Sequence, residues 1–339
     1  MNFDLLVIGS GPGGYVAAIR ASQLGLKTAV IERESLGGIC LNWGCIPTKS
    51  LLKSAQVYEY FLHAADYGIA LDGSVKPDFE KVVGRSRTVA EGMSKGIDFL
   101  FKKNKIEVIN GTGKLKSPGV VEVTDAAGKV SEVKADHVIL ATGARSKELP
   151  NLKQDGKKII GYREAMTLPA LPSSMVVVGS GAIGSEFANF YNTMGTEVTL
   201  VEFLPNVVPL EDDEVSKQLE RSFKKAKMKV MTSSSVESVD TSGKLCKVKI
   251  KTPKGEKEVE AELVLSAVGV APNIEGIGLE ELGIEMEQGK VKVDDYYRTN
   301  VNGVYAIGDI VGGPALAHVA SAEGITCVEK IAGYSPQAV

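Results

Sequence analysis

At 339 residues the chain is longer than one hydrophobic core usually fills, so we expect two or three domains, and its 44% hydrophobic content is enough to build them. Its 39 Lys and Arg residues nearly balance its 42 Asp and Glu residues, which argues against nucleic acid as a partner, and no basic run suggests a membrane surface. No basic leader opens the sequence and no run reaches the roughly 18 apolar residues of a spanning helix, so a cytoplasmic protein is expected.

The first elements predicted along the chain form a βαβ unit. Residues 4–8 are a short apolar run typical of a buried parallel strand, and the glycine-rich stretch GSGPGG follows at 9–14. Apolar residues at helical spacing then predict a helix that Gly25 ends, and residues 27–32 resume a strand.

The next predicted elements are two helices at about 48–66 and 86–104, whose apolar residues are expected to face a core. A polar, alternating stretch at 120–136 predicts a β-meander, which runs into an apolar strand at 137–143. Residues 145–172 hold three prolines and predict a crossing into a second domain.

The second half of the chain repeats this order. The apolar residues 175–178 lead into GSGAIG at 179–184, then a predicted helix and a strand at 197–202. A second meander at 236–262 runs into an apolar strand at 263–269, which ends at a glycine as its counterpart does. Beyond the repeat, a strand and a final helix predict a return to the first domain; they cover 303–309 and about Pro314 to Ile331.

Both glycine-rich stretches lie between a strand and a helix, which is where a dinucleotide pyrophosphate binds. Glu32 follows Gly14 by 18 positions, and Glu202 follows Gly184 by 18, where a carboxylate can accept hydrogen bonds from ribose hydroxyls. Such a carboxylate repels an adenosine 2′-phosphate, so the second site is expected to prefer NAD to NADP. The alternatives are ordinary tight turns and glutamates at solvated strand ends.

Two dinucleotide sites in one chain imply an electron relay, most simply a flavin in one domain and a nicotinamide in the other. The predicted fold class is α/β, with two Rossmann-like FAD/NAD(P)-binding domains of three-layer ββα type, the second inserted into the first. Residues 1–148 are predicted to be the first part of the FAD-binding domain, 149–270 the NAD-binding domain and 271–339 the return segment of the FAD-binding domain.

The segment GGICLNWGCIPTK, residues 37–49, holds two of the four cysteines, Cys40 and Cys45. In a regular helix their Cα atoms would lie roughly 8–9 Å apart, which exceeds the reach of a disulfide. A bridge therefore needs a local distortion, which Gly44 permits, ahead of a helix that Pro47 can open. Such a disulfide would be reducible, and the helix N-terminus would stabilise the Cys45 thiolate.

Zinc ligation and two inert buried cysteines are the alternative interpretations of this segment. Zinc needs two more ligands, but Cys246 and Cys327 lie in distant elements and the three histidines are scattered, so no metal site is expected. Inert cysteines are less expected in a chain with two dinucleotide sites. A redox-active disulfide is the favoured hypothesis.

With these features the chain resembles the flavoprotein disulfide reductases, and among them the dihydrolipoamide dehydrogenase family. The resemblance covers essentially the whole chain through GSGPGG, GGICLNWGCIPTK, ATGAR, GSGAIGSE, VGVAPN, GVYAIGD and LAH. It implies FAD and NAD as cofactors. The FAD-binding residues that it implies are Gly9, Gly11, Pro12, Gly14, Glu32, Thr142, Gly143, Asp309, Ala317 and His318. The NAD-binding residues that it implies are Gly179, Gly181, Gly184, Glu202 and Gly269.

The resemblance also implies roles at the redox centre. Cys40 would exchange with dihydrolipoamide, and Cys45 would be the thiolate that faces the flavin, from which electrons pass to NAD⁺. Lys49 would lie near flavin N5, paired with Glu186; the alternative is an ordinary surface ion pair. The final helix, from about Pro314, would direct its N-terminus towards the flavin.

The family carries a further C-terminal interface domain, which forms a homodimer and supplies a His and Glu acid–base pair. We expect this domain to be absent, because the sequence ends at residues 333–339, where it should begin. None of His63, His137 and His318 is expected to replace the base, so lipoamide turnover is expected to fall by about 10²–10⁴-fold.

The partners that the resemblance implies are the lipoyl domains of 2-oxo acid dehydrogenase or glycine cleavage complexes. Two alternative functions remain open: a related reductase of glutathione or mercuric type, and a non-catalytic nucleotide-binding module of a larger assembly. CLNWGCIPTK and Glu202 argue against the first alternative. Residual NADH:acceptor diaphorase activity is compatible with the leading hypothesis.

Overall fold

The computed structural model describes residues 2–339, which divide into two compact units. Unit 1 comprises the chain up to Asn42 together with Ala90–Arg145 and Ala271–Val339, and unit 2 comprises Trp43–Val89 and Ser146–Val270. The predicted fold class, α/β with the second domain inserted into the first, is confirmed. The assignment of cofactors to 1–148, 149–270 and 271–339 stays a prediction.

Unit 1 is built on a parallel sheet in the strand order β3-β2-β1-β6-β19. The strands are β1 (Asn2–Ile8), β2 (Thr28–Glu32), β3 (Glu107–Asn110), β6 (Val130–Leu140) and β19 (Val304–Ala306). The central strands are almost continuous apolar runs because both faces of a parallel sheet are covered.

Strand β6 joins this parallel sheet to an antiparallel meander. Residues 134–140 pair with β1, whereas residues 130–134 pair with β5 (Val120–Thr124), and β5 pairs with β4 (Thr112–Ser117). The sequence predicted a meander over 120–136 that runs into an apolar strand at 137–143, and it missed β4. In the structure one strand, β6, covers the end of the meander and the apolar run, and its burial changes from alternating to continuous where both faces become covered.

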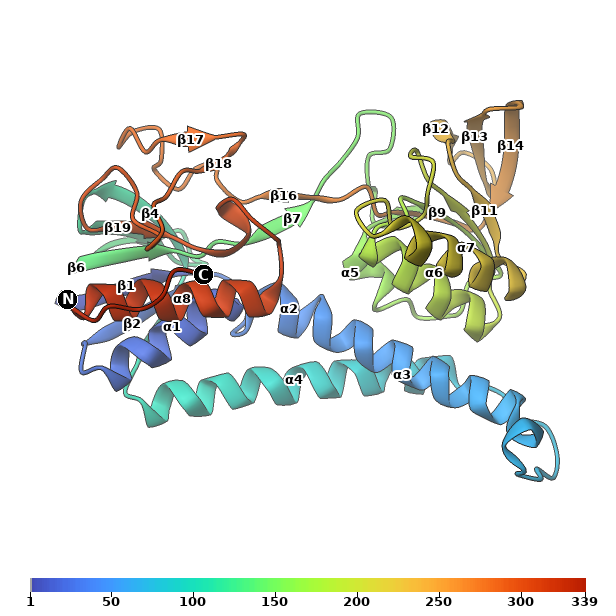
Figure 1. The fold of residues 1–339 in the computed structure, drawn as a ribbon, viewed down its shortest axis with the longest axis horizontal. Helices are drawn as coiled ribbons and strands as arrows, with labels where there is room; N and C mark the ends of the chain where they lie inside the picture. The colour runs from blue at the N-terminus through green and yellow to red at the C-terminus, as the bar shows by residue number, and fades with distance from the viewer. Residues whose placement is uncertain (1) are drawn as a thin grey trace. The chain divides into compact units, whose positions relative to one another are not determined.

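Helices cover the opposite face of the unit 1 sheet from the meander. Leu6 and Ile8 pack in one core with Leu115 and Val121 of the meander. Because side chains alternate along a strand, the residues of β1 next to Leu6 and Ile8 point to the opposite face of the sheet, which the helices cover. Helices α1 (Pro12–Gln23) and α8 (Ala317–Ile331) lie side by side there (Figure 1). The unit therefore has three layers, as predicted.

Unit 2 repeats this architecture with a parallel sheet in the order β11-β10-β9-β15-β8. The strands are β8 (Ile159–Ile160), β9 (Ser174–Val178), β10 (Glu197–Val201), β11 (Lys229–Met231) and β15 (Leu263–Ser266). The meander that packs on one face comprises β12 (Ser235–Asp240), β13 (Cys246–Thr252) and β14 (Gly255–Ala261). In unit 2 the last meander strand, β14, and the sheet strand β15 are separate strands, whereas in unit 1 the single strand β6 fills both positions.

Helix α6 (Ala182–Met194) packs against α3 (Cys45–Leu62) in unit 2. Helix α4 (Phe79–Lys103) begins earlier than the predicted 86–104, because Asp78 accepts a hydrogen bond from the Lys81 N–H at 3.1 Å and caps it. Phe79 then packs on the aromatic residues of α6. Helix α3 ends before the predicted residue 66. The shorter helices are η1 (Ala64–Tyr67), α5 (Tyr162–Ala165) and α7 (Asp213–Lys225).

The remaining strands lie in the connecting and return segments. β7 (Ala144–Ser146) pairs with β16 (Val270–Pro272), and β17 (Met286–Glu287) pairs with β18 (Lys290–Val291). Across residues 2–339, none of the helices is both long and apolar enough to span a membrane. The same residues hold no group of three or more His, Cys, Asp or Glu side chains placed to bind a metal ion.

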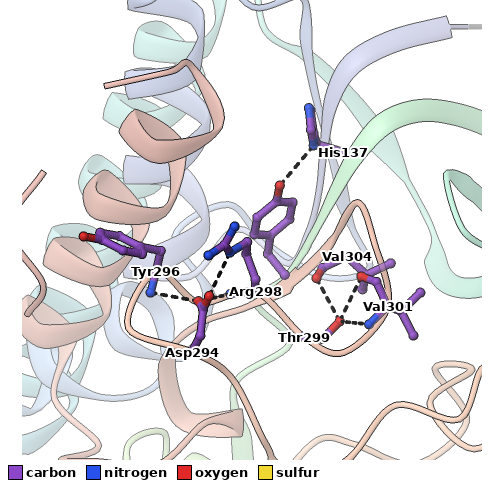
Figure 2. Close-up of polar contacts among 8 residues, drawn as sticks. His137, Asp294, Tyr296, Arg298, Thr299, Val301 and Val304 are labelled. Carbon is purple, nitrogen blue, oxygen red and sulfur yellow. Dashed lines mark hydrogen bonds and ion pairs between the residues drawn. The ribbon is translucent and has the colours of Figure 1, made fainter. Parts of the chain in front are cut away.

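Figure 2 shows how the return segment is fixed before β19 in unit 1. The Asp294 carboxylate accepts hydrogen bonds from the N–H groups of Tyr296 and Arg298, at 2.9 and 3.0 Å, and pairs with the Arg298 guanidinium at 2.7 Å. The Tyr305 hydroxyl lies 3.2 Å from His137 Nδ1 on β6. Burial lowers the pKa of His137, so the contact is one of neutral groups near pH 7.

Candidate active site

Cys40 and Cys45 are joined in a disulfide, and the other two cysteines, Cys246 and Cys327, are buried thiols. The predicted disulfide is confirmed. Zinc ligation and inert thiols are wrong interpretations of this pair, because both require unbonded sulfur atoms.

The cysteines lie on two different helices, separated by the predicted distortion. Cys40 lies in the short α2 (Gly38–Asn42), and Cys45 is the first residue of α3. Between them Gly44 has φ −141° and ψ −115°, outside both the helical and the extended regions. Pro47 is the third residue of α3, where the first N–H groups have no helical acceptor and a missing N–H costs no hydrogen bond.

Lys49 and Glu186 form the ion pair that the resemblance implied. Lys49 Nζ lies 2.6 Å from Glu186 Oε1, which joins α3 to α6 within unit 2. The Lys49 side chain is 63% exposed, so the pair itself contributes little to stability. Lys49 follows Cys45 by four residues, one helical turn, and therefore lies on the same face of α3. Its role near a flavin stays a prediction.

The glycines of unit 1 build a cradle for a phosphate group. Gly9 has φ +101°, and a Cβ on Gly14 would lie 2.0 Å from the Gly9 carbonyl oxygen, so no other residue fits without moving the backbone. A Cβ on Gly11 would meet nothing within 4 Å, and Gly11 begins α1 without a side-chain cap. The helix N–H groups beyond Pro12 and the space above Gly11 fit the pyrophosphate of a dinucleotide.

The glycines of unit 2 have the same geometry. Gly179 has φ +96°, a Cβ on Gly184 would lie 1.9 Å from the Gly179 carbonyl oxygen, and a Cβ on Gly181 would meet nothing within 4 Å. Gly181 begins α6, also without a side-chain cap. These residues fit a second dinucleotide in the same way.

A serine within each glycine motif fixes the acidic residue that follows it. The Ser10 N–H and hydroxyl donate to Glu32 Oε2 at 2.9 and 2.6 Å, and the same groups of Ser180 donate to Glu202 Oε2 at 2.7 Å each. Sequence reasoning missed both serines. The signal was present, because each motif reads GSG with its glutamate at the same spacing.

The other residues expected at the FAD site lie at the ends of the unit 1 strands. Thr142 exchanges hydrogen bonds with Asn273: its hydroxyl donates to the Asn273 carbonyl at 2.7 Å, and the Asn273 amide donates to the Thr142 carbonyl at 2.9 Å. Gly143 follows with φ +67° and open space at its Cβ position. Asn273 was missed because its partner lies 131 residues away.

Two carboxyl groups lie near the end of β19, Asp309 half-buried and Glu323 buried. Asp309 lies in η2 (Gly308–Ile310), and burial raises its pKa. Glu323 of α8 accepts a hydrogen bond from the Gly308 N–H at 2.6 Å, and burial raises its pKa as well. Glu323 was not among the predicted residues.

Ala317 and His318 are the first two residues of α8, which begins three residues later than predicted because Leu316 is extended. Leu316 provides no side-chain cap, and His318 is exposed. In unit 2, Gly269 follows β15 with φ +104° and accepts a hydrogen bond from the Lys147 N–H at 3.0 Å. The ligand contacts predicted for these three residues stay predictions.

Comparisons with known proteins agree with this geometry. A family model described as pyridine nucleotide-disulphide oxidoreductase matches residues 3–324. The chain is 50% identical to a dihydrolipoyl dehydrogenase from Rhizobium etli over 347 residues, covering 98% of this chain and 72% of the relative. A dihydrolipoyl dehydrogenase from Zymomonas mobilis is 48% identical, with 98% and 71% covered.

A solved structure has the same fold. The crystal structure of LpdA from Mycobacterium tuberculosis superposes with a TM-score of 0.91 at 31% identity, covering 99% of this chain and 74% of the other. The predicted cofactors, FAD and NAD, and the predicted enzyme class, an NAD-dependent oxidoreductase with a redox-active disulfide, are confirmed. The chain belongs to the pyridine nucleotide-disulphide oxidoreductase family, among the dihydrolipoyl dehydrogenases.

Proposed function

We propose that the chain oxidises dihydrolipoamide carried on the lipoyl domains of 2-oxo acid dehydrogenase or glycine cleavage complexes. The observation that carries this proposal is the Cys40–Cys45 disulfide at a helix break, in a chain half identical to a dihydrolipoyl dehydrogenase. Cys40 receives the substrate sulfur, and Cys45 is the sulfur that faces the flavin.

The exchange needs only the substrate dithiol and this disulfide. One substrate thiolate attacks Cys40 Sγ, the bond between Cys40 and Cys45 breaks, and Cys45 leaves as a thiolate. The second substrate thiolate attacks the substrate sulfur held on Cys40, which closes the cyclic disulfide and releases Cys40. The substrate loses two electrons and two protons: the cysteine pair gains the electrons, one proton passes to Cys40 and the other to solvent. Cys45 is a good leaving group because it opens α3, whose N-terminal N–H groups stabilise its negative charge.

The glycine motifs hold the two dinucleotides in this proposal. Gly9, Gly11 and Gly14 bind the FAD pyrophosphate, and Glu32 accepts hydrogen bonds from the ribose. FAD, when bound, supplies the two-electron transfer between the reduced cysteine pair and NAD⁺. Lys49, held by Glu186, keeps a positive charge on the α3 face one turn beyond Cys45.

The buried acid of unit 2 supports NAD as the electron acceptor. Glu202 is 6% exposed and both its oxygens are hydrogen-bonded, to Ser180 and to the Leu204 N–H at 2.8 Å. A 2′-phosphate placed against this fixed carboxylate would be repelled. This argues against a glutathione or mercuric type of reductase working with NADPH.

The test is a reductive titration of the purified, FAD-loaded protein, followed by its visible spectrum. The wild type should take up about two electrons per flavin more than the Cys45→Ser variant and show a long-wavelength thiolate–flavin band. Cys246→Ser, which removes a buried thiol of β13, is the matched control and should behave as wild type. Equal uptake by wild type and Cys45→Ser would contradict the proposal. Faster turnover of glutathione with NADPH than of dihydrolipoamide with NAD⁺ would favour the alternative reductase.

A cytoplasmic location and the expected 10²–10⁴-fold loss of lipoamide turnover stay predictions. Turnover of free dihydrolipoamide, measured beside NADH:acceptor diaphorase activity, tests the last of them. A protein with strong diaphorase activity and weak dihydrolipoamide oxidation would support it.

A further inference from the structure

Trp43 lies inside the loop that the Cys40–Cys45 disulfide closes, and it is the only tryptophan of the chain. Two guanidinium groups lie over its ring: Arg87 Cζ is 4.8 Å from the ring centroid and Arg163 Cζ is 5.0 Å from it. Arg87 comes from α4 and Arg163 from α5, so two distant segments of unit 2 meet on one loop side chain.

These contacts are of the kind that holds an aromatic ring firmly. Tryptophan is the strongest aromatic partner for a cation, and the flat guanidinium stacks on it in a way that a lysine ammonium does not. Both arginines are partly buried, and burial lowers the pKa of Arg87. Loss of water around a guanidinium strengthens its attraction to the ring.

The residue before Trp43 is held from the same helix. The Ser94 hydroxyl lies 2.8 Å from Asn42 Oδ1, and the Asn42 amide donates to the Leu36 and Gly38 carbonyls at 3.0 and 2.9 Å. Ser94 follows Arg87 by seven residues, which is two helical turns and the same face of α4. One face of α4 thus contacts Asn42, the last residue of α2, and Trp43, the residue that follows it.

We propose that Arg87 and Arg163 are positioning residues that set the reduction potential of the Cys40–Cys45 pair by holding Trp43. Reduction adds two electrons and two protons and separates the sulfurs. Re-closure then depends on how often Cys40 and Cys45 meet. A loop fixed at Trp43 keeps the two thiols together and so favours the disulfide. The proposal rests on the dithiol chemistry of the proposed function but not on the identity of its substrate.

Loss of order in the Trp43 loop and loss of an arginine charge have opposite effects on the equilibrium between the Cys40–Cys45 disulfide and its dithiol. A mobile loop lowers the effective concentration of one thiol at the other, which makes the disulfide easier to reduce. Removing a positive charge destabilises a neighbouring thiolate, which makes it harder to reduce. Arg87→Lys keeps the charge and loses the flat stacking surface, whereas Arg87→Met loses both. Positioning predicts easier reduction in both variants, with Arg87→Lys the cleaner case.

The experiment equilibrates the FAD-loaded protein with mixtures of reduced and oxidised dithiothreitol, traps the thiols with a maleimide and counts labelled Cys40 and Cys45 by mass. Each disulfide that opens is matched by one dithiothreitol that closes its own ring. The flavin spectrum of each sample counts the electrons held there. The double variant R87K/R163K should shift the equilibrium about tenfold towards the dithiol, which is about 30 mV. Trp43 fluorescence should change with redox state more in the variants than in wild type.

Lys330→Met is the matched control, because it removes a cation that lies 4.5 Å from the Tyr296 ring centroid in unit 1. It should leave the equilibrium unchanged. If the double variant folds poorly, Trp43→Phe weakens the same contacts and should give a smaller shift in the same direction. An unchanged equilibrium in both, or a shift towards the disulfide, overturns the proposal. Failure to oxidise dihydrolipoamide would count against the proposed function only.

Discussion

The two glycine motifs offer a comparison of one local design in two surroundings. Their backbones agree closely: Gly9 and Gly179 have φ +101° and +96°. A Cβ on Gly14 or Gly184 would lie 2.0 or 1.9 Å from the carbonyl oxygen of the first glycine in its motif. In each motif a serine fixes the glutamate through its N–H and its hydroxyl. The short sequence pattern is therefore sufficient to define the cradle.

The surroundings of the acid differ between the units. Glu202 is buried at 6% exposure, whereas Glu32 is partly exposed. Unit 1 instead holds two other carboxyl groups, Glu323 buried and Asp309 half-buried, on the return segment that unit 2 lacks. The glycine motif therefore sets the backbone conformation, whereas the segments packed around it set the electrostatic surroundings of the acid.

The units also differ where the meander meets the parallel sheet. In unit 1 one strand, β6, belongs to both the meander and the parallel sheet. In unit 2 the strand structure is interrupted at Glu262, so β14 and β15 are separate strands. The Glu262 carboxylate accepts hydrogen bonds from the N–H and hydroxyl of Ser173, at 2.8 and 2.9 Å, and its own N–H donates to Ser174 Oγ at 3.0 Å. Side-chain hydrogen bonds here replace the strand pairing that continues through β6.

The largest effect is expected from adding one methyl group to either cradle. Gly14→Ala and Gly184→Ala would place a Cβ only 2.0 and 1.9 Å from a backbone carbonyl oxygen, which is a severe steric clash, so the backbone must move. We expect a loss of about 3–5 kcal/mol in cofactor binding or stability. Gly14→Ala should release FAD, and Gly184→Ala should keep FAD but bind NADH roughly 10²–10³-fold more weakly.

Flavin absorbance after gel filtration and NADH titration measure these two losses. Gly92→Ala, in the exposed middle of α4 with open space at its Cβ, is the control and should stabilise the protein slightly. Weak NADH binding in Gly14→Ala with normal FAD would reverse the assignment of cofactors to the two units.

A smaller effect should separate the two acids. Glu202→Gln removes an acceptor from a buried site and leaves a donor of Ser180 or Leu204 without a partner, which costs about 1–3 kcal/mol. Glu32→Gln should cost less, because water can reach the partly exposed site. Urea midpoints of the two variants, measured beside wild type, give the difference. Equal losses would show that burial of the acid has no energetic consequence.

The smallest effect should appear as a change in pH dependence. Burial raises the pKa of Glu323 above its usual 4.5, so the folded protein holds this proton to a higher pH than the unfolded chain does. Stability is therefore greatest below pH 4.5 for this group and falls as the pH rises through the raised value. Glu323→Gln keeps an acceptor for the Gly308 N–H and should flatten that fall.

Urea unfolding at several pH values between 4 and 8 measures this slope. Glu329→Gln on the same helix, whose carboxylate pairs with Arg20 at 2.6 Å, is the control and should not flatten the slope. A steeper fall in Glu323→Gln than in wild type would rule out the buried carboxyl as its source.

The features that depend on neighbouring residues could be predicted before the structure was known. The two βαβ units, the spacing from Gly14 to Glu32, and the break at Gly44 all follow from local patterns and backbone sterics. Strong local signals of this kind are readable because a buried parallel strand, a glycine turn and a helix start each require particular residues within a few positions.

The features that join distant segments became apparent only in the folded chain. The fixing of Glu32 and Glu202 by serines, the exchange between Thr142 and Asn273, and the two arginines over Trp43 were not predicted. The continuity of β6 was also missed, since the change from alternating to continuous burial reflects a second covering layer. Such contacts depend on how the chain closes on itself, and no local pattern encodes which of many serines, asparagines or arginines will arrive beside a given group.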